Sequence, residues 1–119
     1  TAPALRIQAA PEQLHQVLVN LVMNATKALE SKPAGEPRLI RVSVDAEGND
    51  VVISVEDNGT GIKREHLEKL FIPFFTTSPS GTGLGLSISQ KIVEAHRGRI
   101  EVSTEEGRFT RFSVVIPSL

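Results

Sequence analysis

The spacing of apolar residues marks the start of the chain as helical. From Pro11 onward, apolar side chains recur every three or four residues, as they do along one face of a helix. Proline suits the first helical position because the amide hydrogen that it lacks would have no partner there. The pattern predicts a helix that fades before Pro33, with a loop over 31–38. The predicted apolar face consists of Leu14, Val17, Leu18, Leu21, Val22, Ala25 and Leu29.

The rest of the chain switches between the periods of strands and helices. Alternation at 39–45 and 51–56, with a polar, glycine-containing link between, predicts a hairpin. Gly98 is placed to end a second helix. We expect an α+β fold: a two-layer α/β sandwich with a mostly antiparallel mixed sheet and helices on one face, in a single domain over 1–119. Further elements are predicted at 5–7 (edge strand), 63–70 (short helix), 84–96 (helix), 99–104 and 108–116 (strands).

Composition removes several classes of function. The 119 residues include no cysteine, which excludes disulfides, thiolate zinc sites and iron–sulfur clusters. Thirteen basic and fourteen acidic residues give a net charge of −1, unlike a domain that follows nucleic-acid phosphates. No apolar run approaches the roughly 20 residues that a membrane-spanning helix needs. The default expectation is a cytoplasmic protein in which this region contacts neither nucleic acid nor membrane.

A second face of the first predicted helix carries amides where a solvated face usually has Glu and Lys. Asparagine in mid-helix lowers helix stability, so its presence there needs a reason. Amide oxygens are hard ligands suited to magnesium, which often bridges protein and phosphate. Taken alone, the stripe also fits an ordinary polar surface, which is the commoner situation. It consists of Gln13, Gln16, Asn20, Asn24 and Lys27.

Two glycine clusters flank the middle of the chain. Asp57-x-Gly59-x-Gly61 follows a predicted strand, and it is typical either of a turn or of a carboxylate that binds an exocyclic amine such as that of adenine. The run 81–86, Gly-Thr-Gly-Leu-Gly-Leu, precedes the second long helix, where converging backbone amides attract phosphate. It matches neither a P-loop nor a dinucleotide-fold fingerprint, and a plain helix-start loop is the alternative.

The aromatic and histidine residues add little by themselves. Phe71 is expected in the core, whereas Phe74 and Phe75 adjoin a polar stretch and are candidates to pin a lid. The three histidines share no motif and are expected to be structural or solvent-facing. They are His15, His66 and His96.

The four motifs together occur in one order: an Asn-x-x-x-Asn-Ala-x-Lys helix, Asp-x-Gly-x-Gly, Phe-x-Pro-Phe-Phe and Gly-x-Gly-x-Gly-Leu. From Ala10 to Pro117 the sequence resembles the catalytic ATP-binding domain of bacterial sensor histidine kinases, a Bergerat-type fold shared with gyrase, a heat-shock chaperone and mismatch-repair ATPases. The stretch 71–86 looks most like the nitrogen-regulation group. The resemblance implies ATP and Mg²⁺ as cofactors, and a domain that is the C-terminal fragment of a longer kinase.

The resemblance also implies roles for individual residues, with Asn24 and Lys27 carrying the catalysis. Asn24 would bind magnesium, supported by Asn20, which alternatively touches phosphate, and Lys27 would contact a phosphate. Asp57 would bind the adenine amine in a pocket shaped by Gly59, Gly61 and Ile62, and Thr110 would reach adenine through a water. Thr76 and Thr77 would lie at the lid edge, and the phosphates would be covered by Gly81, Thr82, Gly83, Leu84, Gly85 and Leu86.

Departures from the family pattern qualify these roles. Ala28 stands where many members carry an aromatic residue, which puts base stacking there in doubt. Thr76 and Ser78 stand where arginine and lysine are usual, so Lys27 and magnesium would carry more of the phosphate charge, and Thr60 replaces a frequent proline.

Asn20 bears on mechanism. It stands where the ATP-hydrolysing cousins have a glutamate that activates water, and an amide cannot take that proton. This favours transfer of the γ-phosphoryl group to a histidine on a separate dimerisation domain, within two-component signalling that reaches a response regulator indirectly. The alternatives are an ATP-binding regulatory module without transfer, an anti-sigma-type serine kinase or, remotely, a scaffold that binds no nucleotide.

Overall fold

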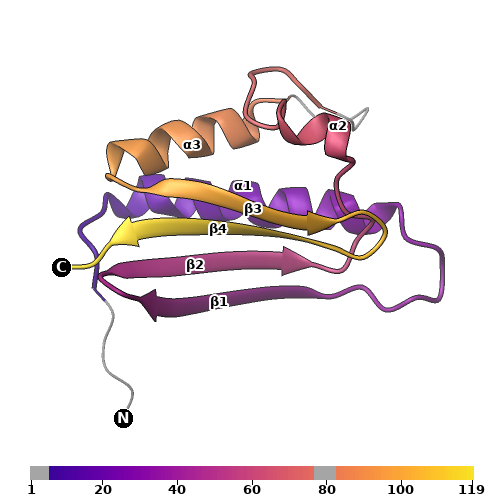
Figure 1. Ribbon diagram of the computed structural model, residues 1–119, viewed down its shortest axis with the longest axis horizontal. Helices are drawn as coiled ribbons and strands as arrows, with labels where there is room; N and C mark the ends of the chain where they lie inside the picture. The colour runs from indigo at the N-terminus through magenta and orange to yellow at the C-terminus, as the bar shows by residue number, and fades with distance from the viewer. Residues whose placement is uncertain (1–5, 77–82) are drawn as a thin grey trace, which may run out of the picture.

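The computed structural model describes residues 6–76 and 83–119. Three helices and four strands follow the predicted order along this part of the chain (Figure 1). The α+β two-layer architecture expected from the sequence is confirmed. The elements are α1 Pro11–Glu30, β1 Ile40–Glu47, β2 Asp50–Asp57, α2 Arg64–Leu67, α3 Gly85–Ala95, β3 Arg99–Glu105 and β4 Phe109–Pro117.

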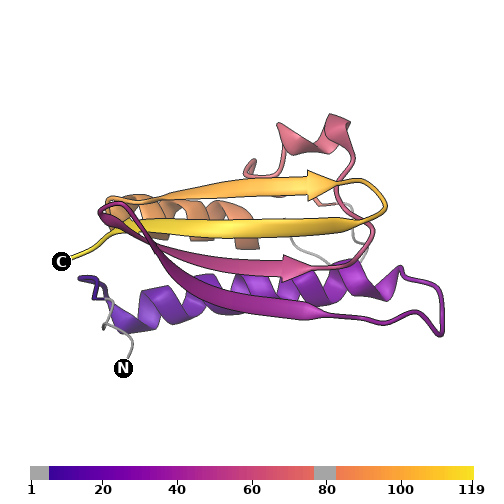
Figure 2. The ribbon, with the colours of Figure 1, turned by 60° about the horizontal axis from the view of Figure 1, so that its bottom comes forward.

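The strands form one sheet in the order β1-β2-β4-β3, and each neighbouring pair is antiparallel. Figures 1 and 2 show α1 and α3 packed on one face of the sheet, with α2 at the end where β2 and β3 finish. The register sets Asp57, the last residue of β2, opposite Thr110 near the start of β4. This end of the sheet therefore collects polar residues that are distant in sequence.

The core lies between the helices and the two central strands. The apolar face of α1 buries Val17 and Leu21 completely, as its periodicity predicts. Alternate residues of β2 and β4 face it, among them Val55 and Val114, and Val93 of α3 completes the contact. Because both helices are fixed through this core, the polar faces beside it are held in place.

The ends of the elements differ in part from the sequence predictions. The edge strand expected at 5–7 is reduced, within the described residues, to one bridge between Ile7 and Ser118. Gly98 does not supply the left-handed turn after α3, because Arg97 adopts the positive φ of 64° there. Gly98 is needed instead for close packing, since a Cβ would overlap the carbonyl oxygen of Val115. None of the helices described is both long and apolar enough to cross a membrane.

Candidate functional site

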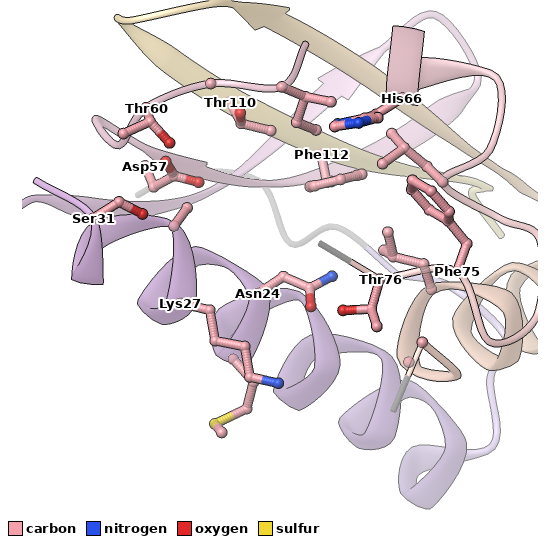
Figure 3. Close-up of a pocket in the computed structure, with 18 of the residues that line it drawn as sticks. Asn24, Lys27, Ser31, Asp57, Thr60, His66, Phe75, Thr76, Thr110 and Phe112 are labelled. Carbon is pink, nitrogen blue, oxygen red and sulfur yellow. The ribbon is translucent and has the colours of Figure 1, made fainter. Parts of the chain in front are cut away.

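A cavity of about 710 Å³ opens at the end of the sheet, between α1 and the segment that leads through α2 (Figure 3). It brings together eleven of the residues predicted from the sequence to bind nucleotide. These are Asn20, Asn24, Lys27, Asp57, Gly61, Ile62, Thr76, Gly83, Gly85, Leu86 and Thr110.

Asp57 is the buried carboxylate of the cavity. It is only 4% exposed, yet it lines the cavity, and its Oδ1 accepts a hydrogen bond of 2.8 Å from the amide of Gly59. Burial raises the pKa of Asp57, and the nearby charge of Glu56 adds to this, whereas the Gly59 amide and Lys32 act in the opposite direction. A buried carboxylate facing a cavity is a strong acceptor for a ligand amine.

The hydroxyl group of Thr104 makes three contacts next to Thr110, the residue paired with Asp57 across the sheet. Thr104 donates its hydroxyl proton to the carbonyl oxygen of Phe109 at 2.8 Å and accepts the amide of Ile62 at 2.9 Å. Thr104 Oγ1 also lies 3.0 Å from Thr110 Oγ1. Since the Thr104 proton is already used, Thr110 is the donor in that pair, and its own oxygen keeps lone pairs for a ligand or a water.

The first glycine cluster allows the loop after β2 to pack tightly. A Cβ at position 59 would lie 2.7 Å from Asp57 Oδ1 and 2.8 Å from the carbonyl oxygen of Ala28. Gly61 has a φ of +73°, and a Cβ there would overlap the carbonyl of Glu105. Gly59 does not itself line the cavity but donates its backbone amide to Asp57, so its predicted role in shaping the pocket is indirect.

Hydrogen bonds of Asn58 and Lys32 connect the loop after β2 to neighbouring segments. Asn58 accepts the amide of Leu39 at 2.8 Å and donates to the carbonyl of Pro37 at 3.2 Å. Lys32 donates to the carbonyl oxygen of Asn58 at 2.8 Å. The loop after α1 and the loop after β2 are thereby joined, which orients Asp57 toward the cavity.

Asn20 links α1 to the start of α3. Its Nδ2 donates to the carbonyl of Gly85 at 3.2 Å and to the hydroxyl of Ser89 at 3.1 Å. Its Oδ1 accepts the side-chain amide of Gln16 at 2.9 Å. In this arrangement the amide positions the glycine-rich end of α3, and its role as a magnesium ligand stays a prediction.

Asn24 points into the cavity one turn further along α1, and Thr76 lies across from it in Figure 3. Lys27 is half-buried at the rim formed by α1. Amide and hydroxyl oxygens at this end suit a hard cation and a phosphate. The polar groups therefore divide into two sets: one around Asp57 and one around Asn24.

The second glycine cluster begins beside the phenylalanine motif. Gly83 has a φ of +75°, a Cβ there would overlap the backbone of Phe74, and the Gly83 carbonyl accepts the Phe74 amide at 2.8 Å. By contrast, a Cβ at Gly85 would find its nearest neighbours in the Asn20 side chain at 3.8 Å, so it fits. Of the remaining predicted residues, Leu84 is not among the cavity-lining residues, and Thr77, Gly81 and Thr82 lie outside the described residues.

Several lining residues were not predicted as ligands. His66 was expected to be structural or solvent-facing, but it lines the cavity; α2 has only four residues, so no helical period in the sequence marks His66 as a lining residue. Phe75, a predicted lid residue, and Phe112 also line it. The other two histidines match the expectation: His15 is exposed, and His96 accepts the Ala10 amide at 3.0 Å. Further lining residues are Met23, Ala28, Glu30, Ser31, Thr60 and Lys63.

Comparison with known proteins decides the family. The family model described as "Histidine kinase-, DNA gyrase B-, and HSP90-like ATPase" matches residues 9–119. The chain belongs to this family. Relatives within it include the sensor histidine kinase ZraS of Escherichia coli O157:H7, 45% identical over 93% of this chain, and sporulation kinase E of Bacillus subtilis, 43% identical over 93%. The chain spans 23% of the first relative and 14% of the second.

Solved structures of kinases from the family share the fold. The catalytic domain of histidine kinase ThkA, solved free of nucleotide, matches with a TM-score of 0.77 and 39% identity, covering 93% of this chain and 70% of that one. Full-length ShkA, solved with AMPPNP, matches with a TM-score of 0.84 and 29% identity, covering 98% of this chain and 24% of that one. The resemblance to histidine kinase ATP-binding domains is therefore confirmed, whereas the nitrogen-regulation subgroup stays a prediction.

Proposed function

We propose that this domain binds ATP with Mg²⁺ and donates the γ-phosphoryl group to a histidine on a separate dimerisation domain of a two-component sensor kinase. The observation that carries the proposal is one cavity with a buried carboxylate at one end and an amide-bearing helix beside a glycine-rich helix start at the other. This division suits a ligand with an amine-bearing base and an anionic tail.

The base would lie at Asp57. Its carboxylate accepts a hydrogen bond from the 6-amino group of adenine, and the Thr110 oxygen accepts another from a water beside the base. Guanine has a carbonyl at the same position, which would oppose the carboxylate and leave it unpaired. The site therefore favours adenine over guanine.

The phosphates would lie between Asn24 and the start of α3. The Asn24 side chain lines the cavity, and its amide oxygen is a hard, neutral ligand, so the residues present fit Mg²⁺, which is usually held by few protein oxygens together with phosphates and waters. When bound, the ion would neutralise phosphate charge. Lys27 adds a positive charge at the rim, and the backbone amides at the start of α3 favour anions.

Asn20 supports transfer rather than hydrolysis. Its side chain is an amide whose polar groups bond to Gln16, Gly85 and Ser89, so it offers no base to a water. In the proposed step the bond between the γ-phosphorus and the ADP oxygen breaks while a bond to an imidazole nitrogen forms. The isolated domain should accordingly hydrolyse ATP slowly.

Exposed apolar side chains on the elements around the cavity suit a docking partner. Val19 and Met23 lie on α1, Ile72 and Phe74 precede the second glycine cluster, and Ile88 lies on α3. An amphipathic helix carrying the acceptor histidine would cover such residues. Phe74, which is 74% exposed with a φ of 70°, is the most accessible of them.

The proposal is tested by incubating this domain with Mg-ATP labelled at the γ-phosphate and the dimerisation domain of its own full-length protein. We expect acid-labile, base-stable label on a histidine of the partner, and none when that histidine is replaced. Acid-stable label on serine would favour an anti-sigma-type kinase. ATP binding with no labelled protein would favour a regulatory module.

Docking is tested separately with Phe74→Asn, because asparagine tolerates the positive φ but removes the apolar ring. Labelling of the partner should fall several-fold while the Kd for ATP stays unchanged. Equal labelling by both proteins would remove Phe74 from the docking surface.

A further inference from the structure

His66 faces the cavity from α2 and is packed against another ring. Its side chain is 28% exposed, and the ring centroids of His66 and Phe75 lie 5.6 Å apart with the planes at 58°. Both residues line the cavity on the side opposite α1, as Figure 3 shows. The nearest carboxylate, Glu65, is mainly exposed, with an oxygen 3.9 Å from Nε2. The imidazole therefore packs with Phe75 as part of an aromatic wall, and it makes no close ion pair with Glu65 that would turn it away from the cavity.

A base anchored at Asp57 would extend toward this wall. Thr110, which pairs with Asp57, and Phe112 lie on the same face of β4, roughly 7 Å apart along the strand. A purine ring bound through its amine at Asp57 would cover that interval. Figure 3 places His66 beside Phe112, at the far end of that interval from Asp57.

The opposite wall offers no ring to the base. From α1, Ala28 contributes only a methyl group to the cavity lining. Among the described lining residues, the aromatic side chains are His66, Phe75 and Phe112, and Phe112 is 5% exposed because it belongs to the sheet core. The ring surface available to a base is therefore concentrated on the His66 side.

We propose that the His66 ring contacts the purine base directly and supplies the stacking surface that α1 lacks. The inference rests on the proposed function, since it needs adenine at Asp57. Phe75 acts as a positioning residue, because its contact keeps the imidazole turned toward the cavity. His66 would thus be a determinant of nucleotide affinity that acts on the base and not on the phosphates.

Proton NMR tests the contact without any activity measurement. The chain has three histidines, so its ring signals are few, and they can be assigned with His15→Gln and His66→Gln variants. On titration with Mg-ATP, the ring protons of His66 should move upfield, as expected above a purine face, while those of exposed His15 stay fixed. Binding detected by calorimetry without a shift at His66 would overturn the inference and leave the proposed function intact. A failure of ATP to bind at all would overturn both.

Affinity measurements on variants separate ring stacking from charge. His66→Ala should raise the Kd about two- to tenfold, the range expected for loss of one aromatic contact, while His66→Phe and the control His15→Ala stay within about twofold of the original. The same factor is expected for adenosine and for ATP. A loss seen with ATP alone, or a His66→Phe variant as weak as His66→Ala, would contradict contact with the base.

Discussion

At the scale of single residues, some cavity residues are constrained by the folded structure and others are not. Asp57 is buried with a raised pKa, which marks a carboxylate that the folded state tolerates poorly when it is charged. Gly61 and Gly83 adopt positive φ values where a side chain would meet backbone. Gly85 has neither constraint, so its lack of a side chain is not required by packing. Such differences allow stability and ligand binding to be separated by substitution.

Stability should fall as pH rises through the titration of Asp57. The pKa of Asp57 is higher in the folded state than in the unfolded chain, so between the two values the folded state binds more protons, and the free energy of unfolding decreases as pH increases. Asp57→Asn keeps the acceptor for the Gly59 amide and removes the charge, so this component of the pH dependence should disappear. Urea denaturation of both proteins from pH 4 to pH 8 measures the difference in their free energies of unfolding. Identical pH profiles would contradict the assignment of this pH dependence to Asp57.

Gly85→Ala should separate stability from binding. Alanine fits the available space and has the higher helix propensity, so the free energy of unfolding should stay equal or rise by up to about 1 kcal/mol. The added methyl should hinder phosphate approach and weaken ATP binding, with adenosine binding unchanged. Thermal unfolding and titrations with the two ligands provide the comparison, and a variant that binds ATP normally would remove this backbone from the phosphate site.

At the scale of elements, the helices cover the edge strand β1 less fully than its central neighbour β2. On β1 the side chains that alternate toward the helices are exposed, Val42 by 56%, whereas their neighbours on β2 are buried, Val55 to 2% exposed. The element-level pattern predicts the same apolar face for both strands. Burial differs because α1 lies over β2 more than over β1, which no property of the β1 sequence indicates.

A matched pair of substitutions tests this inequality. Val55→Thr places a hydroxyl in the core and should lower the free energy of unfolding by about 1–3 kcal/mol. Val42→Thr leaves the hydroxyl in contact with solvent and should change it by less than about 0.5 kcal/mol. Equal losses measured by chemical denaturation would mean that β1 is covered as fully as β2.

At the scale of the whole molecule, the fold brings segments from both halves of the chain to one end of the sheet. Sequence periodicity predicted the order of the elements. The family resemblance carried by the four motifs implied that Asn24, Asp57 and Gly85 share a site, and all three line the cavity. His66 escaped prediction because α2 is too short to show a period. The support of Asp57 by Lys32 and Asn58 also escaped it, since loop-to-loop contacts leave no pattern in sequence.

The most direct test of the central claim is a calorimetric titration of this domain and its Asp57→Asn variant with Mg-ATP. The account predicts one site per chain in the original protein and a Kd about ten- to a hundredfold higher in the variant, the loss expected for a hydrogen bond to a charged group. The variant should remain folded, because asparagine can accept the Gly59 amide as aspartate does. No binding by the original protein, or equal affinity in the two, would contradict the assignment of this cavity as an ATP site anchored at Asp57.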